Sequence, residues 1–198
     1  MKTNQIKNKN IFILAECSIM IALASVLSVI KLYEAPLGGA VTLFSMLPII
    51  YISFKYGIRW GLGSGFVYSV VQLVLGLNSL AYIPTAVGVV SSILLDFILP
   101  FTVLGLAGVV KESDTPPTAS RVIVGTVLAV VLRFAFHFVA GAVIWYSITK
   151  AGEWNTFVFK HGMWAYSFIY NIIYLGPDGG LVILASPAII RFLKSASH

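Results

Sequence analysis

The sequence predicts an all-α integral membrane protein, a bundle of six transmembrane helices with both termini in the cytoplasm. Of its 198 residues, 59% are hydrophobic and 10% are charged, and the mean hydropathy is +0.95. This balance is far too apolar for a soluble domain. Six apolar segments use nearly the whole chain, so we expect one membrane domain over residues 1–198. The expected spans cover residues 11–31, 41–55, 59–77, 86–110, 120–149 and 164–193.

The lysine and arginine residues predict the orientation. Nine lie on the side of the N-terminus, three lie on the other side, and Arg133 is inside a span, which accounts for all thirteen. Cytoplasmic loops carry such an excess, so we expect both termini to be cytoplasmic. A nucleic-acid partner is not expected, because the basic residues are not interleaved with aromatics. The nine are Lys2, Lys7, Lys9, Lys55, Arg59, Lys111, Arg121, Arg191 and Lys194, and the three are Lys31, Lys150 and Lys160.

The first three spans are distinguished by how they end and pack. IFILAECSIMIALASVLSVI forms the first, and its apolar run is longer than a typical signal-peptide core. The connection KLYEAPLGGA contains Pro36, Gly38 and Gly39, which break a helix. The second span, VTLFSMLPIIYISF, is at best one bilayer thick. The third is rich in glycine, which lets helix backbones approach closely.

The last three spans contain the ionisable residues. Asp96 lies in the fourth span, and Arg133 and His137 lie in the fifth. Such groups are unfavourable in a bilayer and are functional-site candidates by default. Arg133, His137, Gly141 and Trp145 recur every four residues, which places them on one helix face as cation, imidazole, gap and aromatic wall.

The sixth span adds aromatic and amide groups. Tyr166, Tyr170 and Tyr174 recur every four residues, with Asn171 one step round the helix. Tyrosines near a membrane boundary often form only the aromatic belt. Buried Asn171, however, needs a hydrogen-bond partner in protein or ligand. Together with the residues of the fourth and fifth spans, these side chains suit a flat, cationic heteroaromatic compound.

Simpler interpretations of the ionisable residues also exist. Asp96 and Arg133 are expected to form an ion pair, which is compatible with a site. His137 alone is more often a core histidine than a ligand, and no second ligand lies at metal spacing from it, so we expect no metal and no cofactor. The single cysteine, Cys17, excludes an intrachain disulfide. Phosphate-binding, metalloprotease and nucleophile-elbow motifs are absent from the sequence, so an enzyme is not expected.

Four stretches, in this order and spacing, resemble one known family. They are LGGAVTLFSMLPI with the following FKYG, LLDFILPFTVLGLAG, LRFAFHFVAGAVIW and YSFIYNIIYLGP. Together they are similar to the thiamine-specific substrate-binding (S) subunits of energy-coupling factor (ECF) vitamin transporters. The resemblance implies a six-helix bundle with a thiamine pocket near the outer face, roofed by the loop between the first two spans. It also implies two kinds of partner, a transmembrane coupling subunit and two ATP-binding subunits.

The resemblance assigns roles to individual residues. The pocket acid falls on Asp96, its basic neighbour on Arg133, and the ring-contacting residues on His137 and Trp145. Several relatives have glutamate and then tyrosine where this chain has Asp96 and Phe97. The remaining matches are Gly141 for the close-approach glycine, Tyr166 and Asn171 for the last span, and Tyr33 as a candidate roof aromatic.

A stripe of small residues on the first span is a candidate docking surface. Ala15, Ser18, Ala22 and Ser25 follow three-and-four spacing, which lets another helix approach closely. The resemblance implies docking of the coupling subunit through small residues on this span. Ordinary packing within the bundle is the alternative.

We therefore expect a high-affinity thiamine-binding subunit that captures the vitamin outside and delivers it with an ATP-driven partner. One alternative is an S subunit for another flat vitamin or precursor. A second is a stand-alone, proton-coupled transporter in which Asp96, Arg133 and His137 relay protons. The third, an intramembrane enzyme, would have to form product with no partner present.

Overall fold

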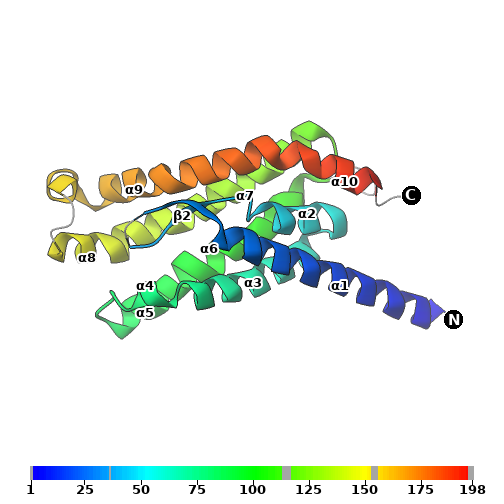
Figure 1. Cartoon of the computed structure of the whole chain (residues 1–198), viewed down its shortest axis with the longest axis horizontal. Helices are drawn as coiled ribbons and strands as arrows, with labels where there is room; N and C mark the ends of the chain where they lie inside the picture. The colour runs from blue at the N-terminus through cyan, green and yellow to red at the C-terminus, as the bar shows by residue number, and fades with distance from the viewer. Residues whose placement is uncertain (1, 36, 113–116, 153–155, 196–198) are drawn as a thin grey trace.

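Helices running along one long axis make up most of the computed structural model (Figure 1). It describes residues 2–35, 37–112, 117–152 and 156–195. The start of α1 (Lys2–Val29) and the end of α10 (Ile189–Ser195) lie at the same end of the molecule. The first and the last described helix therefore have their outer ends on one side of the bundle.

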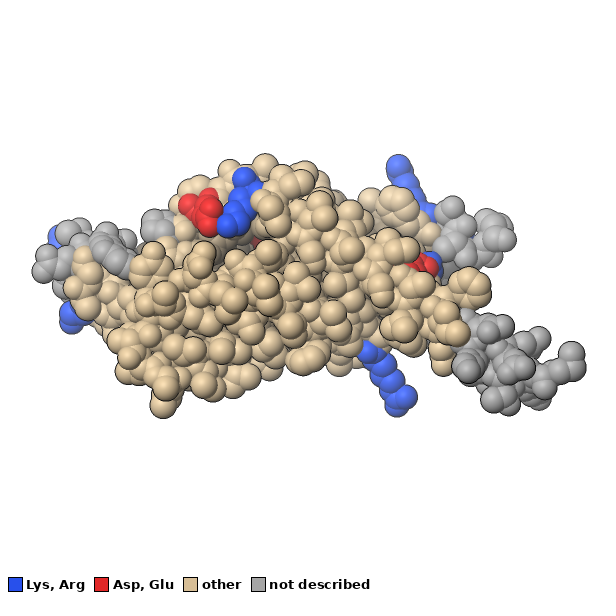
Figure 2. Space-filling view, turned by 60° about the horizontal axis from the view of Figure 1, so that its bottom comes forward, with Lys and Arg blue, Asp and Glu red and all other residues tan. Residues whose placement is uncertain are grey.

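Five helical stretches in the described residues are long and apolar enough to cross a membrane. They correspond to the first, third, fourth, fifth and sixth expected spans. On the face shown in Figure 2, charged side chains are few and other residues cover most of the surface. The exposed side chains include Phe12, Val87 and Leu184, as expected for a surface in contact with lipid. The five stretches are Lys9–Val29, Ile58–Leu75, Ala86–Val110, Ala119–Ala151 and Lys160–Lys194.

The expected span over residues 41–55 is realised only as a short helix. This helix, α2 (Leu47–Tyr56), has 10 residues, a length of ~15 Å against a hydrocarbon core of ~30 Å. Pro48 lies in its first turn, where the missing N–H does no harm. The preceding residues instead form an antiparallel hairpin, β1 (Lys31–Glu34) and β2 (Ala40–Thr42). The helix is buried within the bundle from Pro48 to Phe54.

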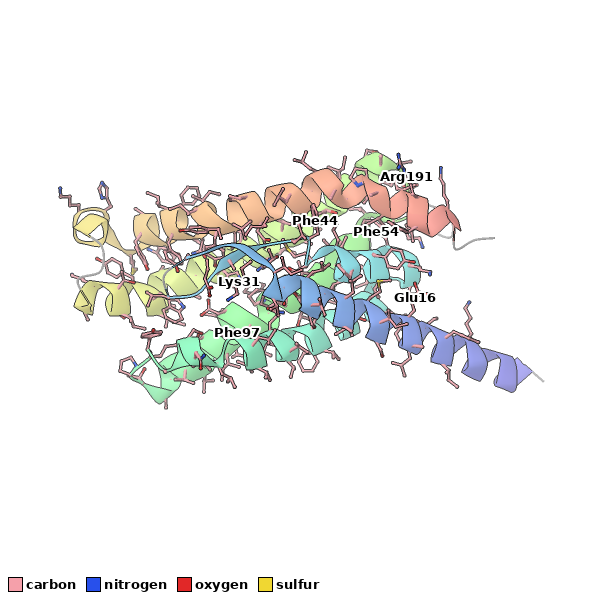
Figure 3. All side chains as sticks on the ribbon, viewed as in Figure 1. Glu16, Lys31, Phe44, Phe54, Phe97 and Arg191 are labelled. Carbon is pink, nitrogen blue, oxygen red and sulfur yellow. The ribbon has the colours of Figure 1, made fainter. Side chains whose placement is uncertain are left out.

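Glu16 ties α1 to α2. Its carboxylate accepts hydrogen bonds from Lys55 Nζ at 2.6 Å, Tyr51 Oη at 2.9 Å and Tyr56 Oη at 2.5 Å. Figure 3 places Glu16 on the side of α1 that faces α2. The hairpin therefore connects α1 and α2, two helices that are held together by these hydrogen bonds.

The fourth and fifth spans are helical but irregular. Each contains one π-helical turn, η1 (Ile93–Ile98) and η3 (Gly141–Trp145). Pro100 follows η1 and cannot donate the helical hydrogen bond to the carbonyl of Asp96. The segments of these two spans are α5 (Ala86–Ser92), η1, α6 (Leu99–Thr102) and the 3-10 helix η2 (Val103–Val110), then α7 (Ala119–Ala140), η3 and α8 (Tyr146–Ala151).

The remaining helices complete the bundle. The third span is α3 (Ile58–Leu75), followed by the single turn α4 (Leu77–Leu80). The sixth is α9 (Thr156–Ala185), which breaks at Gly162, where φ is 76°, and continues through η4 (Ser186–Ala188) into α10.

Glycines let the backbone of α3 approach α6 and η2 closely. A Cβ on Gly105 would collide with the backbone of Gly61, and one on Gly65 would lie 2.8 Å from the carbonyl oxygen of Thr102. Gly63 makes no such contact. The prediction of close backbone approach is confirmed at Gly61 and Gly65.

Candidate ligand-binding pocket

A cavity of about 600 Å³ lies between α3, the two π-helical spans and α9, with the hairpin as part of its wall. Figure 3 places Lys31 and Phe97, which line it, in the half of the molecule away from Arg191. The structure brings nine sequence-predicted residues together in this lining. They are Asp96, Arg133, His137, Gly141, Trp145, Tyr166, Tyr170, Asn171 and Tyr174.

Asp96 is presented by the π-helical turn η1 and collects three neighbours. Its Oδ2 accepts hydrogen bonds from Ser92 Oγ at 2.6 Å and from Trp145 Nε1 at 2.9 Å. Its Oδ1 lies 3.4 Å from His137 Nδ1, a long contact. Since π-helical turns are frequent at functional sites, it is notable that η1 carries Asp96 and η3 carries Trp145.

His137, a lining residue, has one ring nitrogen without a hydrogen-bond partner. With Nδ1–H donating to Asp96, Nε2 is an acceptor, and this atom is buried without a partner. The ring stands edge-on between Phe101 and Tyr174, with centroid distances of 6.4 and 6.2 Å. The imidazole is therefore held in a fixed orientation.

Arg133 pairs with Asp178 rather than with Asp96, which corrects the expected ion pair. Its Nη1 donates to Asp178 Oδ2 at 3.0 Å, and Asp178 is fully buried. The guanidinium also lies over the ring of Phe101, 4.7 Å from the centroid. The partner of Arg133 is therefore Asp178, an acid that the sequence patterns did not single out.

The cavity charges leave Asp96 without a permanent countercharge. Lys31 pairs with Glu34 at 2.6 Å, and Arg133 pairs with Asp178. Among the charged side chains described in the lining, Asp96 is the one that is not paired with a lysine or arginine. Its neighbour is His137, which is charged only if protonated. A cationic ligand would balance the charge of Asp96.

Asn171 is satisfied within the protein and organises the α9 wall. Its Nδ2 donates to the carbonyl oxygens of Ser167 at 2.8 Å and His137 at 3.2 Å, and its Oδ1 accepts from Tyr174 Oη at 2.8 Å. Tyr166 shares a hydrogen bond with Thr149 at 2.7 Å. Their role at the site is to fix the aromatic wall.

Gly141 leaves space for the side chains of Ser167 and Asn171 on α9. A Cβ at this position would collide with Ser167 Oγ and lie 3.0 Å from Asn171 Nδ2. Any larger residue would therefore displace the contacts between η3 and α9.

Three buried polar atoms of the described residues lack a hydrogen-bond partner, and all belong to residues that line the cavity. They are Tyr68 Oη, Arg133 Nε and His137 Nε2. Buried polar groups are nearly always paired, so each such group needs an explanation. All three residues therefore belong to the wall of the same cavity. Among the described residues, no group of three metal-binding side chains comes together.

Two other expected features lie outside the cavity lining. Tyr33, the candidate roof aromatic, is on β1 with 46% of its surface exposed. On α1, the side chains of Ala15, Ser18 and Ala22 are exposed and that of Ser25 is half-buried. Ala15, Ser18 and Ala22 therefore face away from the bundle, whereas Ser25 is partly packed.

Comparisons with known proteins agree on one family. The model of the thiamine transporter protein family (Thia_YuaJ) matches residues 14–197. The thiamine transporter ThiT of Bacillus subtilis is 32% identical over 182 residues, covering 87% of this chain and 86% of the relative. ThiT of Lacticaseibacillus paracasei is 22% identical over 174 residues, covering 83% and 80%.

A solved structure supports the fold. ThiT from Listeria monocytogenes superposes with a TM-score of 0.65 at 22% identity, covering 96% of this chain and 97% of that one. At this identity the likeness speaks for the arrangement of the helices alone.

Proposed function

Since the chain belongs to the thiamine transporter protein family, we propose that its cavity binds thiamine as the S subunit of an ECF importer. The chain is a transport protein of the plasma membrane with several spans, not an enzyme. One observation carries the choice of ligand: Asp96 is a carboxylate without a permanent countercharge in an aromatic-lined cavity.

The chemistry of thiamine matches the groups that the cavity leaves unsatisfied. Its thiazolium ring is a permanent cation, which Asp96 would balance. Its aminopyrimidine ring carries an N–H donor for His137 Nε2, which is buried and unpartnered. Trp145 and Tyr170 supply the flat faces on which both rings can stack.

The proposed orientation places both termini in the cytoplasm and the cavity toward the outside. The nine-to-three distribution of basic residues supports it. The structure is compatible, because α1 begins and α10 ends at one end of the bundle while Lys31 and Phe97 lie in the other half. Thiamine would then enter from outside.

Delivery would require a separate energising module of one transmembrane coupling subunit and two ATP-binding subunits. The sequence itself has no phosphate-binding loop for ATP hydrolysis. The exposed faces of Ala15, Ser18 and Ala22 on α1 are the surface we propose for the coupling subunit, because small residues allow close helix contact.

Proteoliposomes that contain only this chain are expected to bind labelled thiamine without accumulating it. An inward proton gradient should not change the amount retained, whereas the energising module and ATP should produce uptake. The measurement is retained label with and without a protonophore. Protein-free liposomes give the background for binding.

Accumulation by the chain alone, abolished by the protonophore, would contradict the proposal. That result would instead favour the stand-alone transporter that relays protons through Asp96, Arg133 and His137; Oδ1 of Asp96 and Nδ1 of His137 lie 3.4 Å apart.

A further inference from the structure

The hairpin is fastened to one face of α9 at three points. Tyr170 Oη donates to the carbonyl oxygen of Gly38 at 2.6 Å. One turn further, the ring of Tyr174 lies so close to Gly39 that a Cβ there would come within 2.8 Å of it. After another turn, Asp178 accepts from Thr42. The spacing of four residues puts these contacts in one line.

Asp178 is the charged member of this line and holds two parts of the site at once. Its Oδ1 accepts from both the backbone N–H and the hydroxyl of Thr42, each at 2.9 Å, and its Oδ2 pairs with Arg133 at 3.0 Å. Both Thr42 and Arg133 line the cavity. Asp178 is fully buried, so it depends on these partners for its stability.

We propose that Asp178 is a positioning residue that latches the hairpin over the cavity and so sets how long a ligand stays bound. This inference rests on the proposed function in taking thiamine as the ligand. The hairpin contributes Glu34, Ala35 and residues 37–40 to the cavity wall, so release of Thr42 loosens that wall. Loss of the same carboxylate also frees Arg133, whose Nε is already without a partner.

Two variants separate the latch from the ion pair. Thr42→Val removes the side-chain hydrogen bond to Asp178 and keeps the pair with Arg133, whereas Asp178→Ala removes both. Stopped-flow measurements with thiamine should show dissociation about threefold faster for Thr42→Val and about tenfold or more for Asp178→Ala, since losing a buried charged partner acts on the dissociation rate. The association rate should not fall.

Thr126→Val is the matched control. Thr126 is also fully buried, but its hydroxyl donates to the carbonyl oxygen of Val122 in its own helix, outside the cavity lining. Its dissociation rate should equal that of the wild type.

Hydrogen exchange provides a readout that needs no ligand. In the unliganded protein, peptides covering Ala40 to Thr42 should exchange faster in Asp178→Ala than in the wild type, because the Thr42 amide loses its acceptor. If Asp178→Ala does not fold, the thiamine dissociation rate of Thr42→Val still tests the latch.

The outcomes distinguish the latch from the proposed function. Failure of the wild type to bind thiamine would overturn the proposed function, while hairpin exchange would still test the latch. Wild-type binding with unchanged dissociation in Thr42→Val and unchanged hairpin exchange in Asp178→Ala would overturn the latch alone.

Discussion

Asp96→Asn is expected to weaken thiamine binding by ~1–3 kcal/mol, the scale for a hydrogen bond to a charged group. This corresponds to a roughly 5- to 150-fold rise in Kd. The substitution keeps the shape of the side chain but removes the negative charge. The new amide also turns a donor toward Trp145 Nε1 or His137, which now face acceptor oxygens. Titration calorimetry of the purified variant measures the effect.

Glu112→Gln is the control for this substitution. It also converts a carboxylate to an amide, but Glu112 is an exposed residue paired with Arg121. Its Kd should match the wild type. Equal affinity of Asp96→Asn and the wild type would exclude Asp96 from the binding site.

Trp145→Ala is expected to weaken binding by ~2 kcal/mol or more, the range of a buried aromatic anchor. The indole lines the cavity, is only 9% exposed and donates to Asp96 at 2.9 Å. Trp145→Phe should recover part of the affinity, since it restores an aromatic face without the N–H group. Equilibrium binding of labelled thiamine compares the three proteins.

Trp164→Ala tests whether loss of any indole has this effect. Trp164 is 48% exposed on α9 and packs against Phe138. Wild-type affinity is expected for it. Similar losses in Trp164→Ala and Trp145→Ala would indicate a general effect on the bundle instead of a contact with thiamine.

The sequence predicted those helices whose position depends mainly on the hydropathy and length of the segment. Five of the expected spans appear as long apolar helices because a bilayer demands long apolar segments. The second did not, since apolar composition alone does not distinguish a span from a short buried helix such as α2. The hairpin was not predicted, because KLYEAPLGGA indicates only that the first helix ends there. The pairing of β1 with β2 is accompanied by contacts with α9, which the local sequence does not reveal.

Spacing predicted much of the candidate site, and tertiary structure supplied the rest. The four-residue repeats in the fifth and sixth spans identified side chains that share the cavity lining. Asp178 was missed, although an acid within the sixth apolar segment is itself a signal. Its pairing with Arg133 depends on how α7 and α9 are placed, which spacing does not reveal. The π-helical turns likewise have no simple sequence signature.

Titration of the detergent-purified chain with thiamine, followed by quenching of tryptophan fluorescence, tests the central claim most directly. We expect saturable quenching at submicromolar thiamine, which other flat vitamins should not displace at similar concentrations. A folded protein that shows no quenching and no calorimetric signal with thiamine, or that prefers another vitamin, would contradict the account.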